Sequence, residues 1–114
     1  MTVDDLLERA RASLRRVSLD DLPDGAVLVD IRGSDQIARD GELPGAVRIP
    51  RNVLEWRCDP ASPHRDPRVS DPAKPLVLVC HEGYQSSLAA ATLQLLGHPQ
   101  ATDLIGGFAA TLEP

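Results

Sequence analysis

The chain is 114 residues long, which is enough to bury one hydrophobic core but not two, so we predict a single domain over residues 1–114. Its hydrophobic content of 42% and charged content of 25% are ordinary for a globular protein. The formal net charge of −5 argues against nucleic acid as the main partner, because phosphate contacts need clustered lysine and arginine side chains.

The N-terminal residues predict a helix rather than a targeting segment. No stretch approaches the roughly 20 apolar residues of a membrane span, and residues 1–16 lack a signal peptide's apolar core, so we expect no membrane partner and a cytoplasmic location. Thr2 and Asp5 have nearly the spacing and chemistry of a capping box. We therefore predict a helix over about Val3–Arg16, in an N-terminal segment (residues 1–18) that packs on the domain. Its apolar face consists of Leu6, Leu7, Ala10 and Leu14.

This helix also carries a cluster of arginines. Because acidic residues alternate with them at helical spacing, we interpret the cluster as a solvated helix face rather than a binding surface. The basic residues are Arg9, Arg11, Arg15 and Arg16, and the acidic ones are Asp4, Asp5 and Glu8.

Short apolar segments alternate with helical segments along the rest of the chain. This alternation predicts an α/β fold: a small parallel sheet of about five strands, flanked by helices on both faces, with a site at the carboxyl ends of the strands. The predicted strands are Ala26–Asp30, Ala46–Ile49, Leu76–Val79 and Ala101–Leu104. The predicted helical segments are Ser34–Arg39 with Ser34 as its cap, Val53–Arg57, and Ser86–Leu96 ending at Gly97. The prolines of segment 59–75 predict a surface excursion without helix or strand.

One loop points to chemistry. The strand Leu76–Val79 runs directly into Cys80, a short loop containing Gly83, and then a helix. Backbone N–H groups and a helix N-terminus can converge on a sulfur there and stabilise its thiolate. The hydroxyls of Ser86 and Ser87 suit the turn and the helix cap. The alternative is that Cys80 fills space at a strand end, as free cysteines often do.

At these residues the chain resembles the rhodanese-like family of sulfurtransferases. The family's loop has cysteine, two variable residues, glycine, a variable residue, arginine, and then serine or threonine, and Cys80, Gly83 and Ser86 fall on this pattern in register. Three other segments resemble family motifs in the correct order: Val27–Arg32, Gly41–Pro50 and Asp103–Phe108.

The resemblance implies a sulfurtransferase in which Cys80 is catalytic and carries sulfane sulfur as a persulfide. The residues that would bind substrate are those of the loop: His81, Glu82, Gly83, Tyr84, Gln85 and Ser86. The implied donor is a small sulfur-containing anion such as thiosulfate, or a persulfide, and the implied acceptor is a thiol, including a thiol acceptor protein, or a cyanide-like nucleophile. The reaction requires no metal and no organic cofactor.

Departures from the family pattern leave a second hypothesis open. Gln85 stands where many members carry arginine, and Gln has two donors and no charge where an Arg fork has five donors and a fixed charge. A non-catalytic interaction or redox-sensing module would fit that loss. A phosphatase is disfavoured, because the position six after the cysteine, which is arginine in phosphatases of this fold, is Ser86.

Other polar residues have two interpretations each. Asp30 and Arg32 end a strand on the same edge as Cys80, and they either support the site or form an ion pair that ties loops together. His81 is a candidate general base, although adjacent loop residues usually point apart. Cys58 and Cys80 lack zinc or redox spacing, and a disulfide between them is the minor alternative. Two further histidines, His64 and His98, are expected at the surface.

Overall fold

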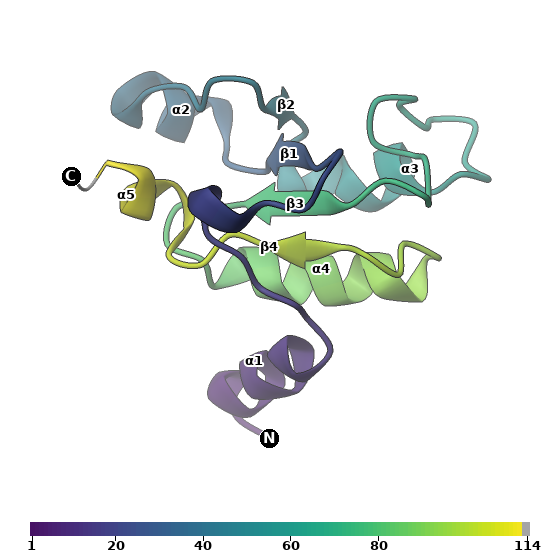
Figure 1. The fold of residues 1–114 in the computed structure, drawn as a ribbon, viewed down its shortest axis with the longest axis horizontal. Helices are drawn as coiled ribbons and strands as arrows, with labels where there is room; N and C mark the ends of the chain where they lie inside the picture. The colour runs from purple at the N-terminus through teal and green to yellow at the C-terminus, as the bar shows by residue number, and fades with distance from the viewer. Residues whose placement is uncertain (113–114) are drawn as a thin grey trace.

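The computed structural model describes residues 1–112, so Glu113 and Pro114 at the end of the predicted domain lie outside the described residues (Figure 1). The strands are β1 (Val27–Asp30), β2 (Val47–Arg48), β3 (Leu76–Val79) and β4 (Thr102–Asp103). The helices are α1 (Val3–Ala12), α2 (Ser34–Asp40), α3 (Leu54–Cys58), α4 (Gln85–Leu95) and α5 (Gly107–Thr111), with short 3₁₀ turns η1 (Leu19–Asp21) and η2 (Arg51–Val53).

The strands form one parallel sheet in the order β2-β1-β3-β4. The two central strands pair over their whole length, from Val27 with Leu76 to Asp30 with Val79. The parallel α/β fold is thus confirmed, but the expected count of about five strands is wrong, since the sheet formed by residues 1–112 has four. A fifth segment reaches the β4 edge only as a single bridge between Val17 and Leu104, which is too short to count as a strand.

Helices and turns cover both faces of the sheet (Figure 1). On one face, α3 and α4 pack against side chains that include the fully buried Val29 and Leu78. On the other face, Phe108 of α5 and residues around η1 pack against Val77 and Val79. Burial of each such side chain contributes about 1.5–3 kcal/mol to stability. The aliphatic sheet therefore forms the rigid base from which the strand ends project.

Helix α1 packs on α4, on the side of α4 away from the sheet (Figure 1). The predicted capping box is present, because Thr2 and Asp5 each accept a hydrogen bond from the other's backbone N–H. The predicted end at Arg16 is wrong: α1 ends at Ala12, and the hydroxyl of Ser13 then donates to the Ala10 carbonyl. The chain leaves the helix there so that Val17 can pair along β4.

The caps of the other helices differ from prediction at their N-termini. Gly33, not Ser34, is the N-cap of α2, and its N–H donates to the side chain of Gln36. Helix α4 ends at Leu95 with Leu96 as its C-cap, one residue before the predicted end. The predicted glycine stop follows directly, because Gly97 adopts a positive φ of 96° and His98 N–H donates to the Leu93 carbonyl.

Segment 59–75 contains no helix or strand, as its prolines predict. The fully buried Val69 anchors it to the core, and Asp66 N–H donates to the Arg57 carbonyl. Within residues 1–112, no helix has the length and apolar character needed to span a membrane.

Candidate active site

Cys80 lies where the carboxyl ends of the two central strands meet. It directly follows β3, and Asp30 ends the neighbouring β1. After β1 the chain continues to the edge strand β2, and after β3 it continues to the opposite edge strand β4. The strand order therefore reverses between β1 and β3, and their carboxyl ends form a topological switch point. Open parallel sheets bind their ligands at such points.

The Cys80 sulfur sits in a cradle of polar groups. The sulfur accepts hydrogen bonds from Gly83 N–H at 3.1 Å and Ser86 N–H at 3.4 Å. The Ser86 hydroxyl oxygen lies 3.2 Å from the sulfur and accepts from its S–H. Ser86 belongs to the first turn of α4, so the helix N-terminus also faces the sulfur. Such an arrangement stabilises negative charge on sulfur.

Two glycines allow the backbone to close around this cradle. Gly83 has a φ of 90°, and a Cβ there would lie 3.0 Å from the Gly106 nitrogen. Gly107 packs directly beneath the loop, where a Cβ would lie 2.6 Å from the Cys80 carbonyl oxygen. The N–H of Phe108 donates to that same oxygen at 2.8 Å. The Gly-Gly turn after β4 therefore fixes the backbone on which Cys80 sits.

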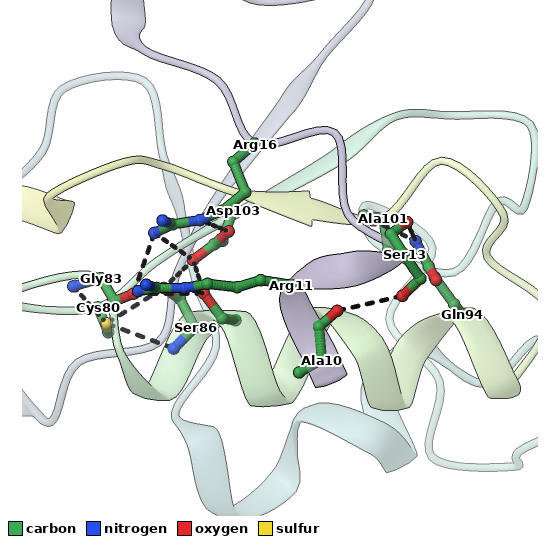
Figure 2. A network of polar contacts seen from close by, with 11 residues as sticks. Ala10, Arg11, Ser13, Arg16, Cys80, Gly83, Ser86, Gln94, Ala101 and Asp103 are labelled. Carbon is green, nitrogen blue, oxygen red and sulfur yellow. Dashed lines mark hydrogen bonds and ion pairs between the residues drawn. The ribbon is translucent and has the colours of Figure 1, made fainter. Parts of the chain in front are cut away.

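Behind the cradle lies a buried carboxylate, Asp103 of β4 (Figure 2). The hydroxyls of Ser86 and Ser87 donate to its Oδ2 at 2.7 and 2.8 Å. Both serines were expected to serve the turn and the helix cap, but α4 begins at Gln85 and they lie inside its first turn. Their hydroxyls face the sheet, where they supply hydrogen-bond donors to the buried carboxylate of Asp103.

Two arginines of the N-terminal segment reach the same loop (Figure 2). Arg16 pairs with Asp103, at 2.9 Å between Nε and Oδ1, and donates to the Gly83 carbonyl at 3.1 Å. Arg11 donates to the same carbonyl at 2.8 Å and to the Ser87 hydroxyl at 3.0 Å. The prediction of a solvated arginine face is wrong for these two residues, because the chain folds them back onto the loop.

Asp30 and Arg32 form a fully buried ion pair at the end of β1, with 2.8 Å between Asp30 Oδ2 and Arg32 Nη2. Arg32 also donates to the Gly41 carbonyl and stacks 3.7 Å above the ring of Phe108. The pair thus ties together the β1, α2 and α5 ends, which is one of the two predicted roles. Arg32 also borders the pocket at Cys80, and its Nη1 has no hydrogen-bond partner among residues 1–112.

A pocket of about 180 Å³ opens from Cys80 to solvent. Tyr84, at 60% exposure, stands on its rim, and its ring lies 5.7 Å from the Arg11 guanidinium carbon. Glu82 and Gln85 are also exposed. The lining brings together most of the predicted site residues with one residue of α2: Arg32, Gln36, Cys80, His81, Glu82, Tyr84 and Gln85. A larger groove of about 630 Å³ contains no residue of this loop.

His81 does not hydrogen-bond to the Cys80 sulfur within the described chain. Its Nδ1 instead lies 3.8 Å from a carboxylate oxygen of Asp40 at the end of α2. The Arg39 side chain holds the pKa of Asp40 below its usual range, so Asp40 presents a carboxylate to the imidazole. This geometry orients His81 away from the sulfur.

The second cysteine has a different environment. Cys58 is fully buried and free, so the alternative of a disulfide with Cys80 is wrong in this structure. Burial raises the pKa of the Cys58 thiol to about 12, with further contributions from Glu55 and Asp66. His98, expected at the surface, is fully buried, and its Nε2 lies 2.6 Å from the Cys58 carbonyl oxygen. The exposed position expected for His64 is observed.

The sequence contains a signal for one of the two residues that sequence reasoning missed, Asp103, but none for the other, Arg16. Asp103 is a charged residue in a segment that otherwise reads as a buried strand, and a buried carboxylate requires partners. Nothing local identifies Arg16 as that partner, since 87 residues separate the two.

The profile of the rhodanese-like domain matches residues 16–113 of the chain. The chain belongs to the rhodanese-like family. Comparison with curated proteins gave no match. Among residues 1–112, no group of three or more His, Cys, Asp or Glu side chains is arranged to hold a metal ion.

Solved structures show the same rhodanese-like fold. One is a protein of unknown function from Rhodopseudomonas palustris, described as a possible tyrosine phosphatase, with 32% identity over 96% of this chain and 88% of that chain, and a TM-score of 0.87. The human single-domain sulfurtransferase TSTD1 has 24% identity, with 87% and 97% covered and a TM-score of 0.69. An NAD-dependent persulfide reductase from A. fulgidus has 22% identity and a TM-score of 0.65, and the match covers 93% of this chain but only 17% of the reductase.

Proposed function

We propose that this protein is a sulfurtransferase that carries sulfane sulfur as a persulfide on Cys80. The observation that carries the proposal is the placement of the sulfur: two backbone N–H groups bond to it within 3.4 Å, at the base of a pocket open to solvent. Such donors stabilise both a thiolate and a persulfide anion. A cytoplasmic location fits the proposal, because a reducing compartment keeps Cys80 as the free thiol.

The proposed reaction has two displacement steps at sulfur. Cys80 first loses its proton to solvent, and its thiolate attacks the outer sulfur of a donor. The sulfur–sulfur bond of the donor breaks, and a thiolate or sulfite leaves with the bonding electrons. A thiolate or cyanide-like acceptor then attacks the terminal sulfur of the Cys80 persulfide, which forms a persulfide or thiocyanate and returns the Cys80 thiolate.

We propose low-molecular-weight persulfides as better donors than thiosulfate. Gln85 borders the pocket with no charge, and Glu82 adds a carboxylate to the lining. A doubly charged donor such as thiosulfate therefore lacks the loop cation that would offset its charge. Arg32 does not replace that cation fully, because Asp30 already pairs with it.

Intact-mass measurement tests the proposal directly. The protein is incubated with thiosulfate and, separately, with glutathione persulfide, and wild type is compared with Cys80→Ser and the matched control Cys58→Ser. We expect a gain of one sulfur atom that requires Cys80, does not require Cys58, and is reversed by cyanide. Absence of sulfur uptake from both donors by the folded protein would instead favour a non-catalytic interaction or redox-sensing module, which the loss of the loop arginine also suits.

The likeness to a protein described as a possible tyrosine phosphatase makes phosphoryl transfer a further candidate, ranked after the interaction or redox-sensing module. The position six residues after Cys80 is Ser86, whose hydroxyl faces Asp103 instead of a phosphate site. Without a loop arginine, the charge of a transferring phosphoryl group is not neutralised. We expect no detectable hydrolysis of an aryl phosphate, and Cys80-dependent hydrolysis would reverse this order of candidates.

A further inference from the structure

Asp103 is the most deeply buried charge beside the candidate nucleophile. It is fully buried, and four donors converge on its carboxylate: Arg16 Nε at 2.9 Å, Arg16 Nη2 at 3.3 Å, and the hydroxyls of Ser86 and Ser87. Figure 2 shows this carboxylate between the arginine above and Ser86 and the Cys80 sulfur below. The network joins the N-terminal segment to the loop through one carboxylate.

The hydroxyl of Ser86 is shared between two partners. Its oxygen lies 2.7 Å from Asp103 Oδ2 and 3.2 Å from the Cys80 sulfur, and it has a single proton to donate. With a neutral thiol, Ser86 donates to Asp103 and accepts from the S–H. When the sulfur is an anion, the same proton can turn to the sulfur, because Asp103 retains Ser87 and Arg16 as donors.

We infer that Asp103, held by Arg16, is a positioning residue for Cys80 that acts through the hydroxyl of Ser86. The inference rests on the proposed role of Cys80 as the nucleophile. Arg16 supplies the charge that lets Asp103 release Ser86 at little cost, and Asp103 opposes charge on the sulfur when Arg16 is absent. The helix α1 that carries Arg11 precedes the rhodanese-like match at residue 16, so this chain adds part of the loop's support from outside the matched range.

The other charged groups around Cys80 are already paired or turned to solvent. Asp30 and Arg32 bind each other, and His81 lies toward Asp40. Glu82 is exposed, and Arg11 donates hydrogen bonds to the Gly83 carbonyl and the Ser87 hydroxyl. Helix α4 contains no charged residue. Arg16 and Asp103 are therefore the ion pair in which removal of one charge changes the electrostatic field at the Cys80 sulfur most.

This arrangement predicts opposite effects from removing the two charges. In Arg16→Gln, the carboxylate of Asp103 stands uncompensated near the sulfur, and the thiolate is disfavoured. In Asp103→Asn, the neighbouring negative charge is lost and Ser86 is free to donate to the sulfur, so the thiolate is favoured. A charge at this proximity shifts the titration of a neighbouring group by about one pH unit.

The test is the pH dependence of iodoacetamide modification of Cys80, measured in a Cys58→Ser background. We expect the midpoint of the rate profile to rise in Arg16→Gln, to fall in Asp103→Asn, and to return toward the parent in the double variant. Arg16→Lys, which retains the charge, should lie near the parent. Arg15→Gln and Asp24→Asn change exposed charges of the same types and should leave the midpoint unchanged.

Shifts of the same sign in both single variants, or no shift in either, would overturn the inference. A merely structural contact would not move the midpoint in opposite directions in the two variants. Circular dichroism confirms folding, and Asp103→Ser serves as the second variant if Asp103→Asn does not fold. Alkylation needs no sulfur donor, so the experiment separates the two proposals. Opposed shifts without persulfide formation would support the positioning role and contradict the proposed function. Persulfide formation without shifts would support the proposed function and contradict the positioning role.

Discussion

Two cysteines of this chain are almost equally inaccessible, yet their surroundings differ in kind. Cys80 is 6% exposed and Cys58 is 0% exposed. The Cys80 sulfur has two backbone N–H donors and a hydroxyl around it, at the end of a strand and the start of a helix. Cys58 ends the short helix α3 within the aliphatic core, where its sulfur makes none of the described hydrogen bonds.

This difference teaches that burial alone does not classify a cysteine. In the core, loss of water raises the pKa of Cys58 to about 12, and none of the hydrogen bonds within residues 1–112 replaces the lost solvation of its sulfur. In the loop after β3, fixed amide dipoles replace water as the partners of an anion. The same degree of burial thus suits Cys58 for packing and Cys80 for chemistry.

The largest expected contrast is in reactivity. At pH 8, iodoacetamide should modify Cys80 at least about 100-fold faster than Cys58, because only about one Cys58 in 10⁴ is then a thiolate. Peptide mass spectrometry of the alkylated protein measures both rates. In guanidinium chloride the two rates should become similar, and comparable rates in the folded protein would contradict the comparison.

The next contrast concerns the backbone beneath Cys80. In Gly107→Ala, a Cβ would lie within 2.8 Å of three backbone atoms of residues 80–82, none of which can rotate away. We expect a loss of about 2–4 kcal/mol of unfolding free energy, from overpacking plus an unfavourable positive φ.

Gly25→Ala is the matched control for that prediction. Gly25 also has a positive φ, of 74°, but a Cβ there meets nothing within 4 Å. Its cost should be about 1 kcal/mol, the conformational part alone. Equal losses in the two variants, measured by chemical denaturation, would show that the contact with the loop is unimportant.

A smaller effect should appear in the pH dependence of stability. Folding raises the pKa of Cys58, so the native state holds this proton more tightly than the unfolded chain does. The resulting stability is complete below about pH 9 and is lost as pH rises toward 12. By pH 10 the loss should be on the order of 1–2 kcal/mol. Cys58→Val removes the titrating group, so its unfolding free energy should fall less than that of wild type between pH 8 and pH 10.

Local sequence predicted those parts of the fold that local chemistry determines. The strand Leu76–Val79, the loop glycine Gly83 and the capping box of Thr2 and Asp5 all depend on residues within a few positions of one another. The alternation of apolar strand segments with helical segments likewise predicts the parallel sheet and the position of Cys80 at the carboxyl ends of its strands.

The long-range partners of the loop were not predictable in this way. Arg11 and Arg16 look like members of a solvated helix face, and only the early end of α1 at Ala12 turns Arg16 toward Asp103. His98 follows a helix-ending glycine, which suggests the surface, but its imidazole fills space beside Cys58. In each case a tertiary contact outweighs the local preference: the buried carboxylate of Asp103 takes Arg16 as its ionic partner, and the buried His98 pairs through Nε2 with the Cys58 carbonyl.

The smallest expected effect concerns the donor selectivity of the Cys80 loop. Gln85→Arg would add a guanidinium to the lining of the pocket, where Gln85 is exposed and free to be replaced without disturbing the core. We expect KM for thiosulfate to fall about tenfold, since a charge-assisted bond to an anion contributes roughly 1.5–3 kcal/mol less the cost of ordering the side chain. KM for a low-molecular-weight persulfide of lower charge should change less, and Gln85→Met, which adds no charge, should change neither. A gain in Gln85→Met equal to that in Gln85→Arg would mean that side-chain volume, and not charge, limits thiosulfate binding at this loop.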